Sequence, residues 1–251
     1  MRSPLVALLA IALVVATGCQ LFEPKPAELL SSGAANLKAA KTVHMNGRGT
    51  YALKDGMSLQ FDFTFDGDAS FADTTSHITI EMSMLGQNLS TESITLPGKA
   101  YAKNPVTGTW TESANAAGTP GLDPLGNTDL SGVENVVEID RPSVDGKGTR
   151  HLGYTVSNDK LREAMTRSAG GTSGSVSVSD IDGRGEIWIR TDDRQIVRQL
   201  VKVSFGMSGA GLGLPTTGAG SGSATFSISM DMKFSKHGEP IPQITAPPIR
   251  R

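Results

Sequence analysis

Residues that could do chemistry are few and widely spaced in this chain. The single cysteine, Cys19, directly follows the small residues 16–18, and the histidines are scattered. No two histidines have the HxxxH or HExxH spacing of a helical zinc site, so we expect no histidine metal site. We expect the histidines to occupy water-exposed positions in strands or loops. With one thiol, the chain cannot form an internal disulfide or a multi-cysteine zinc site. The four histidines are His44, His77, His151 and His237.

Motifs of catalysis and nucleotide binding are also missing. The stretch Gly206-Met207-Ser208-Gly209-Ala210 lacks the last glycine of a GxSxG nucleophile elbow, and no GK[ST] sequence completes a phosphate-binding loop. The acidic pairs Asp66/Asp68 and Asp192/Asp193 are expected at turns, where aspartate is favoured, and no EF-hand pattern is present. We therefore expect no enzyme, no cofactor and no metal.

The N-terminal segment has the features of an export signal. Arg2 precedes an apolar run, Leu5–Val15, which is too short to span a hydrocarbon core that needs about 20 helical residues. The small residues before Cys19 resemble the lipobox of bacterial lipoproteins, in which the cysteine is diacylated and becomes the mature N-terminus. An ordinary secretory signal that contains a cysteine is the alternative. We expect a signal peptide over residues 1–18 and a lipid anchor on Cys19 at the outer side of the cell membrane.

Charge and composition indicate one domain after this anchor. Residues 19–26 form a short lipidated tether with two prolines, and residues 27–251 show no internal repeat or linker. The whole chain has a formal net charge of −2 and no block of like charge. A nucleic-acid-binding protein would normally show a basic face or a high pI, so we expect no nucleic-acid partner.

Most of this domain has the two-residue periodicity of half-buried strands. The alternation of apolar and polar residues is unbroken over 57–66, 77–84 and 226–234. Strict alternation gives each strand one wet and one apolar face, which antiparallel sheets allow. Further strands are expected over 43–53, 89–95, 99–103, 108–112, 151–156, 185–190 and 196–205.

Three short helices accompany these strands. Residues 27–41 are rich in Ala, Leu and Lys after Pro26, and Asn158 can cap a second helix that ends at Gly170-Gly171. Asn127 or Thr128 can cap a third helix, with Leu130, Val133 and Val137 on one side. The expected fold class is α+β: a large curved antiparallel sheet, open like a half-barrel, with a few short helices on its concave face.

Several stretches resemble the LppX/LprG-type lipoproteins of mycobacteria, which share the fold of the LolA/LolB lipoprotein carriers. The resemblance lies in residues 27–53, in Leu96–Lys103 followed by Trp110, in His151–Val156, in Gly185–Ile189 followed by Gln195–Arg198, and in Phe234–Ile241 followed by Thr245–Pro248. It implies a half-barrel with a hydrophobic cavity for acyl chains of envelope lipids or acylated glycolipids. A membrane transporter is a candidate partner.

The apolar strand faces support a lipid cavity independently of this resemblance. Methionine is unusually frequent in the expected strands, and its flexible thioether adapts to irregular partners, although a gap-filling role in an ordinary core explains it equally well. Three short helices can cover only part of so large a sheet. The expected lining is Met57, Leu59, Phe61, Phe63, Ile78, Ile80, Met82, Met84, Leu130, Val133, Leu161, Met165, Phe226, Ile228, Met230 and Met232.

The resulting hypothesis is a membrane-anchored lipoprotein that binds lipids and carries them within or across the cell envelope. One alternative is an envelope sensor or partner-binding module on the same fold, without lipid cargo. The other is an envelope hydrolase, which lacks a catalytic motif here. The uncharged, glycine-rich stretch Gly206–Ser223 is expected to be a loop, either a hairpin tip or a flap beside the cavity.

Overall fold

One antiparallel sheet organises the protein. The computed structural model describes residues 23–55, 57–84, 86–113, 130, 132–168, 177–208 and 223–249. The helices are α2 (Pro26–Ala39) and α4 (Asn158–Ser168). The strands are β1 (Thr42–Asp55), β2 (Met57–Ser70), β3 (Thr75–Met84), β4 (Gln87–Leu96), β5 (Lys99–Lys103), β6 (Trp110–Ser113), β7 (Val133–Asp140), β8 (Ser143–Val144), β9 (Lys147–Val156), β10 (Ser177–Arg190), β11 (Ile196–Ser208) and β12 (Ser223–Ser235).

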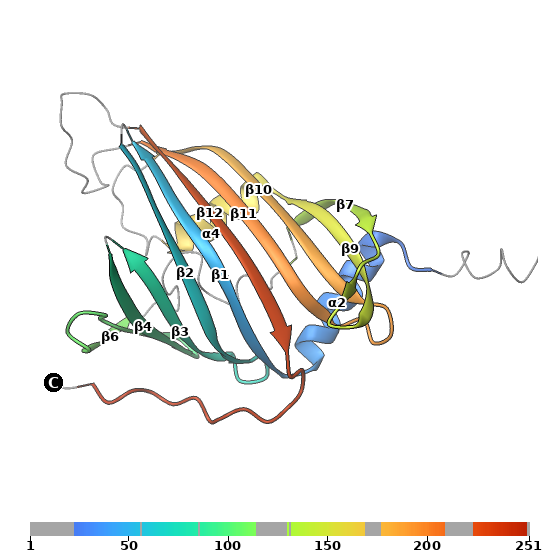
Figure 1. Ribbon diagram of the computed structural model, residues 1–251, viewed down its shortest axis with the longest axis horizontal. Coiled ribbons are helices and arrows are strands. Elements are labelled where there is room, and N and C mark those ends of the chain that lie inside the picture. The colour runs from blue at the N-terminus through green and yellow to red at the C-terminus, as the bar shows by residue number, and fades with distance from the viewer. Residues whose placement is uncertain are drawn as a thin grey trace, which may run out of the picture.

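The strands form an open sheet in the order β6-β5-β4-β3-β2-β1-β12-β11-β10-β9-β7, and β8 pairs with β9. Every pairing is antiparallel, and β1 pairs with both β2 and β12 in the middle of the sheet. Both described helices lie behind the curved sheet in Figure 1, on the same side of it. The expected fold class, an open antiparallel α+β sheet with short helices on one face, is confirmed.

Helix α2 packs against the face of the sheet that we call the inner face. Its residues Leu29, Leu30 and Leu37 are buried in the main apolar cluster. At Gly33, a Cβ atom would lie 3.0 Å from Ile189 Cδ1 of β10, so the glycine lets the helix approach the sheet closely. Neither described helix is long and apolar enough to cross a membrane.

The prediction of a helix with Leu130, Val133 and Val137 on one side is wrong. Residues 133–140 form the edge strand β7, which pairs with β9. Two register shifts in this pairing and the positive φ of Asn135 (53°) break the alternation of inward and outward residues. The apolar spacing of Leu130, Val133 and Val137 therefore imitates that of a helix. The β-branched valines favour the strand, and β9 provides its hydrogen-bonding partner.

Other boundaries also differ from expectation. Gly206, Met207 and Ser208 extend β11, and Ser208 pairs with Ser223 of β12 instead of belonging to a loop. Residues 209–222, the rest of that stretch, lie outside the described residues, as does the expected end of α4 at Gly170-Gly171. Asp66 and Asp68 lie within β2, whereas Asp192 and Asp193 lie in a turn as expected.

Candidate functional site: the apolar inner face

The inner face of the sheet gathers the apolar residues of the central strands in cross-strand rows. In antiparallel strands, paired residues project to the same face, so the register identifies each row. One row joins Val201, Met230, Gly49, Phe63 and Met82, and the next joins Gln199, Met232, Gly47, Phe65 and Ile80. Five of the expected lining residues therefore lie side by side on one surface.

Glycines in β1 make room for the aromatic rings of β2. A Cβ atom on Gly49 would lie 2.2 Å from Phe63 Cζ, and one on Gly47 would lie 2.6 Å from Phe65 Cζ. Both rings are almost fully buried. The rings of Tyr51 and Phe63 have centroids 5.4 Å apart, and those of Phe63 and Phe65 are 6.4 Å apart. The absence of side chains at the two glycines thus allows the rings of Phe63 and Phe65 to pack directly over the backbone of β1.

Burial along the inner face falls from the α2 end toward the opposite end of the strands. Near α2, Met45 and Ile80 are 0% and 1% exposed. In the row that contains Ile228, Tyr51 and Phe61, all three side chains are only partly buried. Leu59, one row further, is 43% exposed. The described apolar surface therefore continues beyond the part that is fully covered, and we call this partly covered part the open end.

The expected lining residues divide along this gradient. Phe63, Ile78, Ile80, Met230 and Met232 are buried, whereas Phe61, Met82, Phe226 and Ile228 are partly buried. Leu130, Val133 and Leu161 are also partly buried, and the first two pack against the main cluster although they belong to no helix. The side chains of Met57, Met84 and Met165 lie outside the described part of the structure.

Some inner-face residues at the open end are absent from the expected lining. Tyr51 and Leu53 of β1 and Val203 and Phe205 of β11 lie in the same rows as Phe61, Leu59, Ile228 and Phe226. The rings of Phe205 and Phe226 stack with centroids 5.4 Å apart. The alternation within the expected strands 43–53 and 196–205 carried the signal for these residues.

A buried polar pair interrupts the apolar surface near α2. Gln199 Nε2 donates a hydrogen bond to Tyr154 Oη over 2.8 Å, and both side chains are buried. Burial raises the pKa of Tyr154 to about 12, so the phenol stays neutral. A Cβ atom on Gly185 would lie 2.1 Å from Tyr154 Cζ, so this ring also lies over a glycine.

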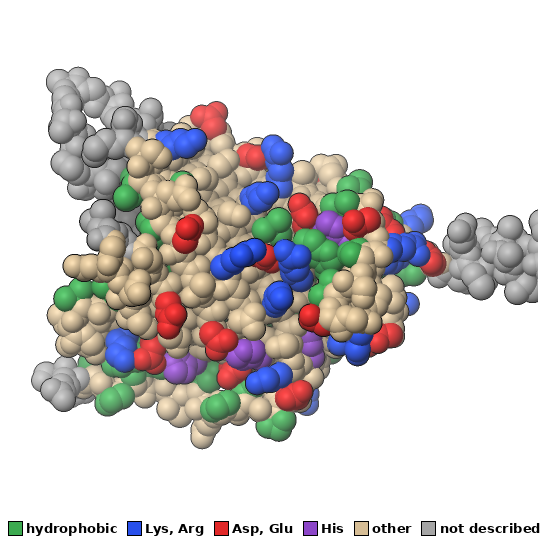
Figure 2. All heavy atoms as spheres, in the orientation of Figure 1, with side chains coloured by type: hydrophobic (Ala, Val, Ile, Leu, Met, Phe, Trp, Pro, Cys, Tyr) green, Lys and Arg blue, Asp and Glu red, His purple; other side chains and the backbone are tan. Residues whose placement is uncertain are grey.

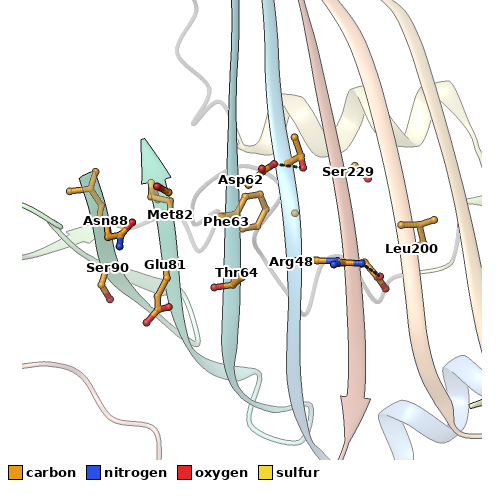
Figure 3. A pocket seen from close by; sticks show the side chains of 15 residues that line it. Arg48, Asp62, Phe63, Thr64, Glu81, Met82, Asn88, Ser90, Leu200 and Ser229 are labelled. Atoms are coloured by element: carbon orange, nitrogen blue, oxygen red, sulfur yellow. Dashed lines mark hydrogen bonds and ion pairs between the residues drawn. The ribbon is translucent and has the colours of Figure 1, made fainter. Parts of the chain in front are cut away.

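The outer face is polar and holds a shallow depression of about 830 Å³ (Figure 3). Its lining includes Arg48, Asp62, Glu81 and Asp231, whose side chains lie opposite to the inner face. Arg48 lies 4.0 Å from Asp231, and Thr50 Oγ1 donates to Asp62 Oδ1 over 2.7 Å. Gly49, Phe63 and Met82 of the inner-face rows also border this depression, so two of the expected lining residues lie beside it.

Histidine side chains on the outer face are less exposed than expected. His151 is 8% exposed and stacks on Trp188 with centroids 4.0 Å apart. Its ring nitrogens lie 2.8 Å from Asp140 Oδ1 and 3.0 Å from Glu186 Oε2. The expectation of water-exposed histidines is wrong for His151, because pairing with carboxylates and stacking on indole compensate its burial. The described residues contain no group of three or more potential metal ligands.

The Arg198–Asp231 pair predicts an acid-sensitive contribution to stability. Hydrogen bonds from Arg198 of 2.7 and 2.8 Å hold the pKa of Asp231 below its ordinary value, and they outweigh the opposing effect of burial. A carboxylate with a lowered pKa stabilises the fold above its unfolded pKa, and this contribution is lost as the pH falls through the folded pKa. We expect Asp231→Asn to reduce the free energy of unfolding at neutral pH by about 1 kcal/mol. It should also flatten the fall in stability below about pH 4.

Urea denaturation between neutral pH and about pH 3 measures both effects. The matched control is Asp182→Asn, which removes a more exposed carboxylate that pairs with Arg184. An equal acid response of wild type and Asp231→Asn would contradict the prediction.

The chain belongs to the class of proteins built on an open antiparallel sheet with short helices on one face. No family model matches it, and no curated protein matches it in sequence. Similar solved structures include lipoprotein LppX of Mycobacterium tuberculosis, with 16% identity, a TM-score of 0.47 and coverage of 86% of this chain and 98% of LppX.

Two further structures are similar. LprF of Mycobacterium bovis is 15% identical, with a TM-score of 0.46 and coverage of 90% of this chain and 98% of LprF. A LolA superfamily protein of Nitrosomonas europaea is 11% identical, with a TM-score of 0.31 and coverage of 84% of this chain and 94% of that protein. LppX is a member of the group of lipoproteins that the sequence resembles.

Proposed function

We propose that this protein is a membrane-anchored lipoprotein that binds acyl chains of envelope lipids on its inner face and carries them within the envelope. The observation that supports the proposal most is the gradient of burial toward the open end. There Leu59 is 43% exposed, and Phe61, Phe226 and Ile228 are partly buried. Burial of each methylene of an acyl chain on such a surface contributes about 0.8 kcal/mol. Cys19 would be the acylated anchor.

Phenylalanine and methionine make the open end suited to chains of variable shape. Aromatic rings offer flat apolar surface, and methionine side chains adapt to irregular neighbours. A flexible acyl chain needs such a surface and no polar recognition group, in agreement with the apolar character of the rows from Met230 to Phe226. Specificity for a headgroup would then arise outside these rows.

The second candidate is a partner-binding module on the same fold. It is favoured by the nearly complete burial of Phe63, Phe65, Met230 and Met232, because this part of the inner face is a packed core. In that case the open end would receive an apolar segment of a partner protein, and acyl chains would not bind.

Titration with a fluorescent sixteen-carbon fatty acid tests the proposal on the full chain with Cys19→Ser. We expect Leu59→Asp to weaken binding at least about tenfold, because a charge would contact the acyl chain at a site that is already partly exposed. The matched control is Leu200→Asp, the same substitution on the outer face beside the depression. It should leave binding unchanged.

Circular dichroism and thermal unfolding show whether both variants fold. No binding by the unsubstituted inner face, or an equal loss in both variants, would overturn the acyl-binding proposal. Native mass spectrometry after membrane exposure adds an independent readout, because a carrier should retain co-purifying lipid. Retention of a protein instead of lipid would support the partner-binding module.

A further inference from the structure

Two neighbouring apolar side chains are exposed on the edge strand β7. Val137 is 57% exposed and Ile139 is 51% exposed, and we call them the β7 apolar pair. Both lean over the same glycine of β9, since a Cβ atom on Gly153 would lie 3.1 Å from Ile139 Cδ1 and 3.8 Å from Val137 Cγ2. In Figure 2, hydrophobic side chains gather beside a histidine at the end of the molecule where β7 and β9 lie. The pair is therefore one continuous apolar surface.

Glu23 and Pro24, which follow Cys19 closely in the chain, form hydrogen bonds with residues at the β7 edge of the sheet. Arg141, two residues after Ile139, donates from Nη1 and Nη2 to both carboxylate oxygens of Glu23 over 2.9 and 2.5 Å. These hydrogen bonds hold the pKa of Glu23 below its ordinary value, so the pair is ionic at neutral pH. Arg150 Nη1 also donates to the carbonyl of Pro24 over 2.8 Å, and its side chain is 7% exposed. Glu23 and Pro24 are thus held at β7 and β9.

The length of the remaining chain limits how far this edge can lie from the anchor. Three residues lie between Cys19 and Glu23, so four Cα–Cα steps join them, and an extended chain spans at most about 3.6 Å per step. Glu23 therefore lies within about 14 Å of the Cα atom of Cys19. An acylated Cys19 would lie at the membrane surface, so β7 would be the strand held closest to it.

The charged side chains around the β7 apolar pair have hydrogen-bonding partners within the protein. Asp140 pairs with His151, and Glu138 accepts hydrogen bonds from Arg150 and Arg141. Exposed apolar side chains bind the interface between headgroups and acyl chains in proportion to the apolar area that they bury there. We propose that the β7 apolar pair docks into the membrane interface when Cys19 is acylated, and this inference rests on the proposed anchor.

The sequence makes a clean labelling experiment available. Because Cys19 is the only cysteine and is acylated under the proposal, Val137→Cys introduces the single free thiol of the mature protein. A nitrobenzoxadiazole label at this position reports insertion through quenching by lipids that carry a shallow nitroxide. The matched control is Val106→Cys, another valine that is 81% exposed but lies between β5 and β6 at the opposite edge of the sheet.

In vesicles reconstituted with the acylated full chain, we expect at least about twofold stronger quenching at position 137 than at position 106. Adding Ile139→Asp to the labelled Val137→Cys protein should reduce this quenching to the level of the control. Equal quenching at positions 137 and 106 would overturn the docking proposal. So would concentration-dependent protection of position 137 without quenching, which indicates pairing of two β7 edges.

The outcomes separate this inference from the proposed function. If the protein is absent from the vesicle fraction, the anchor on Cys19 is refuted and the docking proposal falls with it. If the protein is anchored but position 137 is not quenched, docking alone is refuted. Binding of the fluorescent fatty acid, measured on the same preparation, decides the acyl-binding proposal in either case.

Discussion

Replacing Gly49 by valine is expected to lower the free energy of unfolding by about 3 kcal/mol or more, because a side chain at this position overpacks the core. A Cβ atom alone would lie 2.2 Å from Phe63 Cζ. The ring cannot move out of the way at low cost, since Phe63 is 3% exposed and lies between Tyr51 and Phe65. Urea denaturation followed by circular dichroism measures the loss.

A matched substitution separates this effect from a general intolerance of valine in strands. At Gly148 in β9, the nearest atom to an added Cβ is Thr191 Oγ1 at 3.4 Å, and the position is exposed. Gly148→Val should therefore change the stability by less than about 1 kcal/mol. Combining Gly49→Ala with Phe63→Leu should cost less than the sum of the single changes. Additive losses would show that the ring over Gly49 is not the cause.

Replacing Cys19 by serine is expected to reduce the membrane-bound fraction of the protein at least about a hundredfold, because acyl chains supply most of the partitioning free energy. The fold should be unaffected, since the described contacts begin at Glu23. Binding of the fluorescent fatty acid should persist while delivery of lipid between membranes is lost. Fractionation of cells, followed by binding and transfer assays on the purified protein, measures these three properties.

The control for this experiment is Gly18→Ala, which keeps a small residue before Cys19 and should retain anchoring. Retention of the Cys19→Ser protein in the membrane would contradict the lipid anchor and point to another mode of attachment. Loss of fatty-acid binding in the soluble Cys19→Ser protein would mean that the anchor supports the binding site itself.

Strand positions were largely predictable because their alternation is a local property. Residues Met57 to Asp66 alternate without a break, and they form most of β2 with the apolar positions on the inner face. The same is true of β3 and β12. One wet and one buried face impose this pattern whatever the neighbouring strand is, so sequence alone reveals it.

Features that depend on a neighbour in space were not predictable in this way. The two register shifts in β7 follow from its pairing with β9, and without that pairing Val133 and Val137 look like one side of a helix. The position of the Phe63 ring over Gly49 likewise depends on the register between β1 and β2. A glycine in a strand signals a close approach, but the sequence does not name the approaching group.

In the candidate site too, features set by local alternation were predictable, whereas features that depend on neighbours in space were not. Alternation identified Phe63, Ile80, Met230 and Met232 as members of one apolar surface. It could not show that these four are buried whereas Leu59 is exposed, because that difference depends on which part of the sheet is covered. The tie between Arg141 and Glu23 joins residues 118 positions apart and has no local signature.

The central place of β1 between β2 and β12 has a consequence for folding kinetics. β1 is the first strand of the chain, but one of its two neighbours is β12, the last strand of the chain. His44 of β1 therefore pairs with Ser235 of β12. Closing so long a loop costs conformational entropy before the contacts can repay it, and folding dominated by such contacts is slow. The hairpin of β1 and β2 can form while synthesis continues, yet the seam with β12 must wait for nearly the whole chain.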